Sequence, residues 1–114
     1  MRRGTTPTHT FIVDVSLNDI SDLYVTYKQG KNIVVEKTLE DVDIDQEEHS
    51  ILVYLTQEDT LKFRTNEWTW LYPNENKQDM QILVQIRIKY GDGKAIASDI
   101  ISMNVQEILK EGEI

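Results

Sequence analysis

The sequence predicts an all-β fold, a single immunoglobulin-like β-sandwich of about seven strands over residues 1–114, with one projecting β-hairpin arm. Three observations support this prediction. Apolar residues recur at every second position through most of the chain, which is typical of half-buried strands. Glycine-containing turns separate several of these segments. A long segment of helical periodicity is missing, and short antiparallel strands joined by turns form two-layer β folds.

The first half of the chain contains three of the expected strands. Residues 1–8 are expected to form a flexible N-terminal arm. The segment "THTFIVDV" follows, with Phe11, Val13 and Val15 in phase. A hairpin turn at Gly30-Lys31 then joins "DLYVTYKQ" to "NIVVEKTL". We expect the inward pairs of this hairpin to come from Leu23, Val25, Tyr27, Ile33 and Val35.

The middle of the chain combines an acidic segment, a strand and a helical turn. "EDVDIDQEE" at 40–48 is interpreted as an edge strand with Val42 and Ile44 inward, since charge on an edge opposes aggregation. "SILVYLT" is a strand with its odd-numbered apolar residues inward. Thr56 and Asp59 have the spacing of a capping box, which predicts one helical turn.

The second half contains the clearest strand. "MQILVQIRIKY" at 80–90 places its even-numbered apolar residues on one face, and "GDGK" is a hairpin turn. In "AIASDIISMNV" the alternation breaks, so we predict a β-bulge between Ser98 and Ile101. Residues 66–79 are predicted as an aromatic hairpin or loop insertion. Residues 106–114 are expected to be a C-terminal tail that forms a helical turn or trails off.

Composition argues against several classes of function. The formal net charge is −8. An acidic chain repels phosphate, so nucleic-acid and anionic-membrane partners are not expected. Cysteine is absent, which excludes disulfides and thiolate metal sites. The sequence has no apolar run long enough for a transmembrane helix, and the start "MRRGTTPTHT" has no apolar region of a secretory signal.

Catalytic, cofactor and metal sites are not predicted. His9 and His49 stand in no catalytic motif, and "GDG" is too short to hold phosphate. The acidic segment 40–48 resembles the first half of a calcium loop. It lacks the later glycine and the bidentate glutamate, because Gln46 and Leu52 occupy those positions. The prediction is therefore a protein that is not an enzyme, with the acidic segment as a solvated edge.

The stretch "EWTWLYPNENK" at 67–77 contains the candidate partner-binding residues. Trp68, Trp70 and Tyr72 share one face of the expected arm. Leaving two tryptophans in water would forgo roughly 8 to 12 kcal/mol of burial, so they are expected to be covered. Three interpretations stay open at this point: burial in the protein's own core, burial against a protein partner or a second copy, and stacking on a small ligand such as a sugar.

Several segments together resemble a known group of proteins. These are "MRRGTTPTHTF", "VTYKQ", "VVEKTL", "LTQEDTLKF", "QIRIKYGDGKAIASDII" and "ILKEGEI". Over nearly its full length the chain is similar to small uncharacterised proteins encoded by phages and prophages of Gram-positive bacteria, among tail and other structural genes. The middle more weakly resembles the immunoglobulin-like N-terminal domain of phage baseplate upper proteins. The chain departs from the group at 66–79, so the aromatic arm is interpreted as an elaboration.

This resemblance implies a role in particle structure. We expect a non-catalytic tail or baseplate assembly protein that acts through protein–protein contacts, located in the host cytoplasm or in the virion, with itself or other tail components as partners. The resemblance provides no catalytic residue. The alternative function is a small carbohydrate- or ligand-binding β-sandwich module that uses the face of Trp68, Trp70 and Tyr72.

Overall fold

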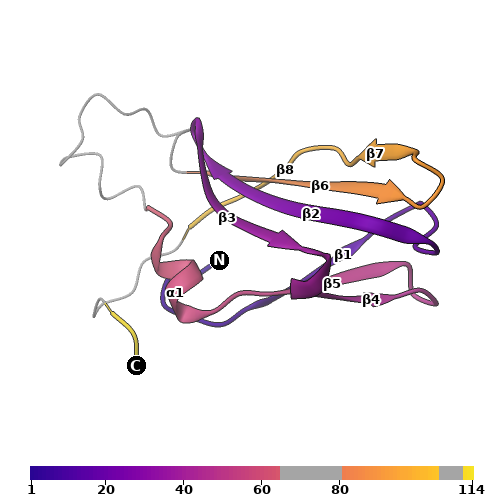
Figure 1. Ribbon diagram of the computed structural model, residues 1–114. Coiled ribbons are helices and arrows are strands. Elements are labelled where there is room, and N and C mark those ends of the chain that lie inside the picture. The colour runs from indigo at the N-terminus through magenta and orange to yellow at the C-terminus, as the bar shows by residue number, and fades with distance from the viewer. Residues whose placement is uncertain (65–80, 106–111) are drawn as a thin grey trace.

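In the computed structural model the chain forms two antiparallel β-sheets that lie in separate layers (Figure 1). The structure describes residues 1–64, 81–105 and 112–114. The three-stranded sheet has the order β1-β5-β4, from strands Thr8–Ile12, Ser50–Tyr54 and Val42–Asp45. Among the described residues the predicted all-β class is confirmed.

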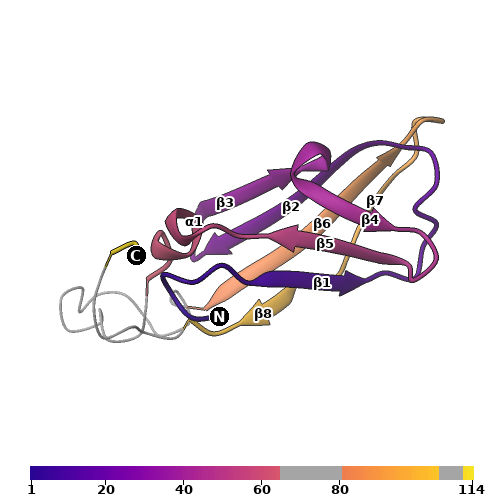
Figure 2. The same ribbon diagram turned by 90° about the horizontal axis from the view of Figure 1, so that it is seen from below.

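The other sheet is larger and is built around its two longest strands. β2 (Ile20–Gln29) and β6 (Ile82–Tyr90) pair antiparallel at its centre. β3 (Asn32–Thr38) lies outside β2, and both β7 (Ala95–Ala97) and β8 (Ile101–Met103) pair with the far side of β6. Viewed from below, β1 and β8 run along one side of the molecule, and β3 and β4 run along the other (Figure 2).

One hydrophobic cluster takes side chains from both sheets. In β6 the alternation that the sequence predicts places the even-numbered residues inside, as the two-residue period of a strand requires. The buried members of the cluster are Phe11, Leu17, Leu23, Val25, Tyr27, Val35, Val42, Ile51, Val53, Leu55, Phe63, Ile82, Val84, Ile86 and Ile88.

Two short helical segments connect the layers. α1 (Gln57–Leu61) is capped by Thr56, whose side-chain oxygen accepts a hydrogen bond from the Asp59 amide at 3.1 Å. The Asp59 carboxylate accepts in return from the Thr56 amide at 3.0 Å, so the predicted capping box is confirmed. A single 3-10 turn, η1 (Leu39–Asp41), precedes β4 and was not predicted. Its capping box is formed by Thr38 and Asp41, three residues apart like Thr56 and Asp59.

The predicted bulge in the last sheet strand is confirmed by the pairing register. Arg87 pairs with Ala97, and Val84 pairs with Ile101. Three steps along β6, from 87 to 84, are therefore matched by four steps on the opposite strand, from 97 to 101. The opposite strand thus contains one extra residue. This extra residue divides the strand into β7 and β8 and reverses the facing of the side chains that follow.

The expected position of Ile33 is wrong. Its side chain is 58% exposed, whereas Val35 is buried as predicted. Tyr27 pairs with Val35 and Lys28 pairs with Ile33, so Val34 is an extra residue in β3. The bulge changes the parity of β3 and turns Ile33 to the outer face of the sheet.

Both ends of the chain make hydrogen bonds to the rest of the fold. Residues 1–8 were expected to form a flexible arm, yet Arg3 is only 4% exposed and donates to the Leu61 carbonyl at 2.9 Å. The Met1 amine donates to the Asn104 carbonyl at 2.8 Å, so the segment lies against the fold. At the other end, the Ile114 amide donates to the Gln57 side chain at 2.7 Å. The predicted arm at 66–79 lies outside the described residues.

Candidate functional site

The predicted partner-binding residues Trp68, Trp70 and Tyr72 lie outside the residues that the structure describes. The described residue nearest before them, Arg64, is held against the end of β2. Its amide donates to the Gln29 side chain at 2.8 Å, and its carbonyl accepts from the same side chain at 2.8 Å. The role of the three aromatic residues therefore stays a prediction.

One hollow of the described surface is a groove beside β1, and most of the residues that line it are aliphatic. We call it the open groove. It has a volume of about 330 Å³. Ile86 and Ile88 of β6 form part of its lining, and the chain from Ile12 to Val15 contributes another part. The remaining lining comes from the β7–β8 region: Ile96, Ala97, Ser98, Asp99 and Ile101.

Several aliphatic side chains of the open groove are in contact with solvent. Ile12 is 81% exposed, Ile101 41% and Ile96 37%. Ile96 and Ile101 pair with the buried residues Ile88 and Val84, so all of them belong to the core face of the five-stranded sheet. The core face of this sheet is thus covered along most of β6 and uncovered at its β7–β8 border.

The bulge produces this exposed border. Without an extra residue, Ile96 and Ile101 would have opposite facing, because they differ in parity. The bulge is held by Ser98, whose side-chain oxygen accepts from the Ile86 amide at 3.0 Å and whose amide donates to the Ile86 carbonyl at 2.8 Å. Ile96 and Ile101 are thereby brought to one face of the sheet. The neighbouring Ile100 is 62% exposed.

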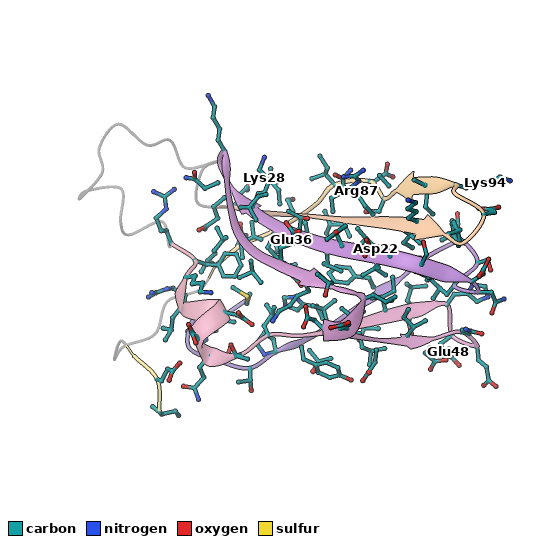
Figure 3. All side chains as sticks on the ribbon, in the orientation of Figure 1. Asp22, Lys28, Glu36, Glu48, Arg87 and Lys94 are labelled. Atoms are coloured by element: carbon teal, nitrogen blue, oxygen red, sulfur yellow. The ribbon has the colours of Figure 1, made fainter. Side chains whose placement is uncertain are left out.

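Charge is distributed unevenly between the layers. The strands β1, β4 and β5 contain no lysine or arginine, and β4 and its turn contain four acids: Asp43, Asp45, Glu47 and Glu48. The larger sheet contains both signs. Figure 3 shows Lys28 and Arg87 on its outer side and Glu48 at the turn of the smaller sheet. A second hollow of about 290 Å³ lies on the larger sheet, and its lining includes the charged residues Asp22, Arg87 and Lys89.

Within the acidic segment at 40–48, the predicted edge strand is formed by Val42–Asp45 alone, which is β4. Val42 is buried, Ile44 is half-buried, and Asp43 and Asp45 are exposed. The aspartates of the segment have separate partners: Asp41 accepts from Thr38, Asp43 from the Tyr54 hydroxyl at 2.7 Å, and Asp45 from the Glu48 amide. Within the described ranges the structure contains no group of three acidic or histidine side chains that could hold a metal ion.

The two histidines lie in different surroundings. Nδ1 of His9 lies 2.8 Å from the Tyr27 hydroxyl, and the two rings are 5.8 Å apart. Burial lowers the pKa of His9, and the nearby positive amine of Met1 lowers it further. Burial also raises the pKa of the Tyr27 hydroxyl. His49 lies in the turn after β4, where a ring nitrogen is 3.3 Å from the Val15 carbonyl oxygen.

Sequence reasoning missed the open groove, although two signals for it were present. Ile12 is an apolar residue out of phase with Phe11 and Val13, and the alternation breaks between Ile96 and Ile101. A solvent-exposed isoleucine next to a strand edge is one signal, and a bulge that gathers isoleucines is the other. Neither signal reveals that the segment at 12–15 and the β7–β8 region line the same groove, because their proximity depends on the order of the strands in the two sheets.

Comparison with known proteins adds no family to these observations. No protein-family model matches the chain, and no curated protein matches it. None of the helices in the described parts of the chain is long and apolar enough to cross a membrane.

Proposed function

We propose that this chain is a non-catalytic structural protein of a phage or prophage, which acts in the tail or baseplate by binding other proteins. The observation that carries the proposal is the apolar surface along the β1 and β7–β8 side of the molecule. Ile12, Ile96 and Ile101 line the open groove there, and each is more than one third exposed. Clustered exposed aliphatic side chains, in contrast to scattered ones, are typical of protein–protein contacts.

The proposal includes the finer description of the fold. We propose that the two sheets form an immunoglobulin-like sandwich, in which β7 and β8 are the two halves of one bulged strand. Counted in this way the described strands number seven. Such domains place open sheet edges along both sides, and open edges are surfaces on which another chain can pair. The resemblance to phage and prophage proteins encoded among tail genes supports the same role.

The direct test is the composition of phage particles. Particles induced from a prophage that encodes the chain are purified, separated into heads and tails, and probed for the chain with an antibody. We expect the chain in tails or in tail-assembly intermediates, and we expect its deletion to lower the yield of complete tails. Absence from both fractions, together with an unchanged yield after deletion, would contradict a structural role.

A second test concerns the aromatic residues. The double substitution Trp68→Ser/Trp70→Ser is compared with the unchanged chain by light scattering, with circular dichroism as a control for folding. A folded mutant that loses self-association or tail incorporation assigns the binding role to these residues. A mutant that unfolds places the tryptophans in the core of the protein. A folded mutant with unchanged incorporation leaves the β1 side as the binding surface.

A further inference from the structure

Three of the four outer sheet edges carry features that prevent pairing with another strand. β4 has two exposed aspartates, Asp43 and Asp45. β3 contains a bulge at Val34 and an exposed Glu36. The β7–β8 edge is interrupted by its bulge. Charges and bulges on edge strands oppose the addition of further strands, so these edges are protected.

The fourth edge, β1, lacks these features. Its sequence from Thr8 to Ile12 is "THTFI", without a charged carboxylate, a lysine or a proline. Its pairing with β5 keeps one register from Thr8 opposite Tyr54 to Ile12 opposite Ser50. β1 pairs with β5 alone among the described strands, so its other side presents backbone donors and acceptors to a further strand.

The unprotected edge adjoins the open groove. Ile12 at the end of β1 lines the groove together with Ile86 and Ile88 of the opposite sheet. A strand added to β1 would direct every second side chain toward the interior, because side chains of a strand alternate between faces. The groove volume of about 330 Å³ is sufficient for a few aliphatic side chains.

The charges around the groove select the occupant. Asp14 and Asp99 are the ionisable residues of its lining, and both are exposed. In the described part of the structure, neither carboxylate has a hydrogen-bond or ion-pair partner. A basic residue is absent from the lining. A second copy of this chain has a net charge of −8 and would be repelled. Lysine or arginine side chains of another protein would be attracted by the two carboxylates.

We propose that the β1 edge and the open groove bind an extended segment of another protein, in which aliphatic residues alternate with basic residues, as an added β-strand. The proposal rests on the proposed structural function and names the chemistry of the partner. Backbone pairing with β1 provides affinity, and the aliphatic side chains enter the groove. The basic side chains face Asp14 and Asp99.

The test uses a defined peptide and two matched variants. The probe is a fluorescein-labelled peptide of alternating valine and lysine, about nine residues long, and binding is followed by fluorescence anisotropy. Ile12→Lys and Ile33→Lys introduce the same charge at two exposed isoleucines, one in the groove and one on β3. We expect Ile12→Lys to weaken binding by about tenfold or more and Ile33→Lys by about threefold at most.

Further variants separate the contributions of charge and pattern. The double substitution Asp14→Asn/Asp99→Asn is expected to weaken binding about fivefold at low salt, and addition of salt should reduce this difference. Glu36→Gln/Asp92→Asn removes the same charge outside the groove and serves as the control. A peptide with the same residues in two blocks, or with glutamate in place of lysine, should bind at least about tenfold more weakly.

Each outcome decides between occupants. Equal binding by the Ile12→Lys and Ile33→Lys proteins, or by the lysine and glutamate peptides, would overturn the proposal. So would light scattering that shows a dimer dissociated by Ile12→Lys, because the occupant would then be a second copy. Failure of the peptide to bind a chain that is present in tails refutes the strand-binding site alone. Peptide binding by a chain that is absent from tails refutes the structural role alone.

Discussion

The two ends of the hydrophobic core are covered to different extents. At the end near α1, which we call the closed end, Tyr27, Gln29, Thr60 and Phe63 are all at most 1% exposed. At the open groove, the core-facing side chain of Ile101 is 41% exposed. Both ends are built from strands with the same alternation of apolar residues. The alternation therefore determines which side chains face the interior, and a different feature determines whether they are covered.

That feature is the presence of chain segments that cross from one layer to the other. At the closed end, Thr60 Oγ1 donates to the Thr5 carbonyl at 2.9 Å, and Gln29 binds the backbone of Arg64. Arg3 joins the same region through the Leu61 carbonyl. Each bond joins segments that are distant in the sequence. Near the open groove the Tyr90 hydroxyl donates to the Ser16 carbonyl at 2.6 Å, but neither residue lines the groove, and its aliphatic side chains stay exposed to a partner.

The largest expected effect lies at the closed end. Phe63 is fully buried and its ring packs edge-on against Tyr27, with 6.1 Å between the centroids. Phe63→Ala is expected to lower the free energy of unfolding by about 3 to 5 kcal/mol, because the cavity cannot fill completely. Urea denaturation measures the effect. The control is Tyr54→Ala, an exposed aromatic residue of β5, whose cost should be about 1 kcal/mol or less.

A smaller loss is expected when the bridge to Arg64 is removed. Gln29→Leu preserves most of the side-chain volume but leaves the Arg64 amide and carbonyl without the partners they have in the structure. We expect a loss of about 1 to 3 kcal/mol in the free energy of unfolding. Gln85→Leu is the comparison, since that side chain makes one bond to the Ser98 carbonyl in a half-buried position. A larger loss at Gln85 than at Gln29 would show that crossing segments do not stabilise the closed end.

Most of the described fold could be predicted from local patterns. The period of two identified the strands, Gly30 and "GDG" identified the hairpins, and Thr56 with Asp59 identified the helical turn. Each of these depends on residues close together in the sequence. The bulge at 98–101 was predictable because it reverses the parity of a continuous apolar pattern. The bulge at Val34 was not, since "NIVVEKT" permits either parity at Ile33.

The candidate site could not be predicted in the same way. The open groove brings together Ile12, Ile86 and Ile101, which come from three separate segments. Their proximity follows from the order of strands in two sheets, and that order has no local signal. The same limitation applies to Arg3: a basic residue next to the N-terminus suggests a solvated arm, and its burial depends on the position of the Leu61 carbonyl.

The pH dependence of stability provides a test at the closed end. Burial lowers the pKa of His9 below its ordinary value of 6.5. The unfolded chain therefore binds a proton at a higher pH than the folded chain, so stability falls as the pH decreases through and below 6.5. We expect His9→Gln to remove this part of the decline, measured as the free energy of unfolding between about pH 7 and 5. An identical decline in the His9→Gln protein would place its cause elsewhere.

The smallest expected effect lies at the open groove and tests whether it is open in solution. Ile12→Thr should change the free energy of unfolding by about 0.5 kcal/mol or less, because the side chain is already 81% exposed. The same substitution at the fully buried Ile51, on the neighbouring strand, should cost about 2 to 4 kcal/mol, since it removes apolar contacts and buries a hydroxyl group. If both substitutions cost the same, Ile12 is covered in the free protein. The groove would then resemble the closed end, and an added strand would have to displace whatever covers it.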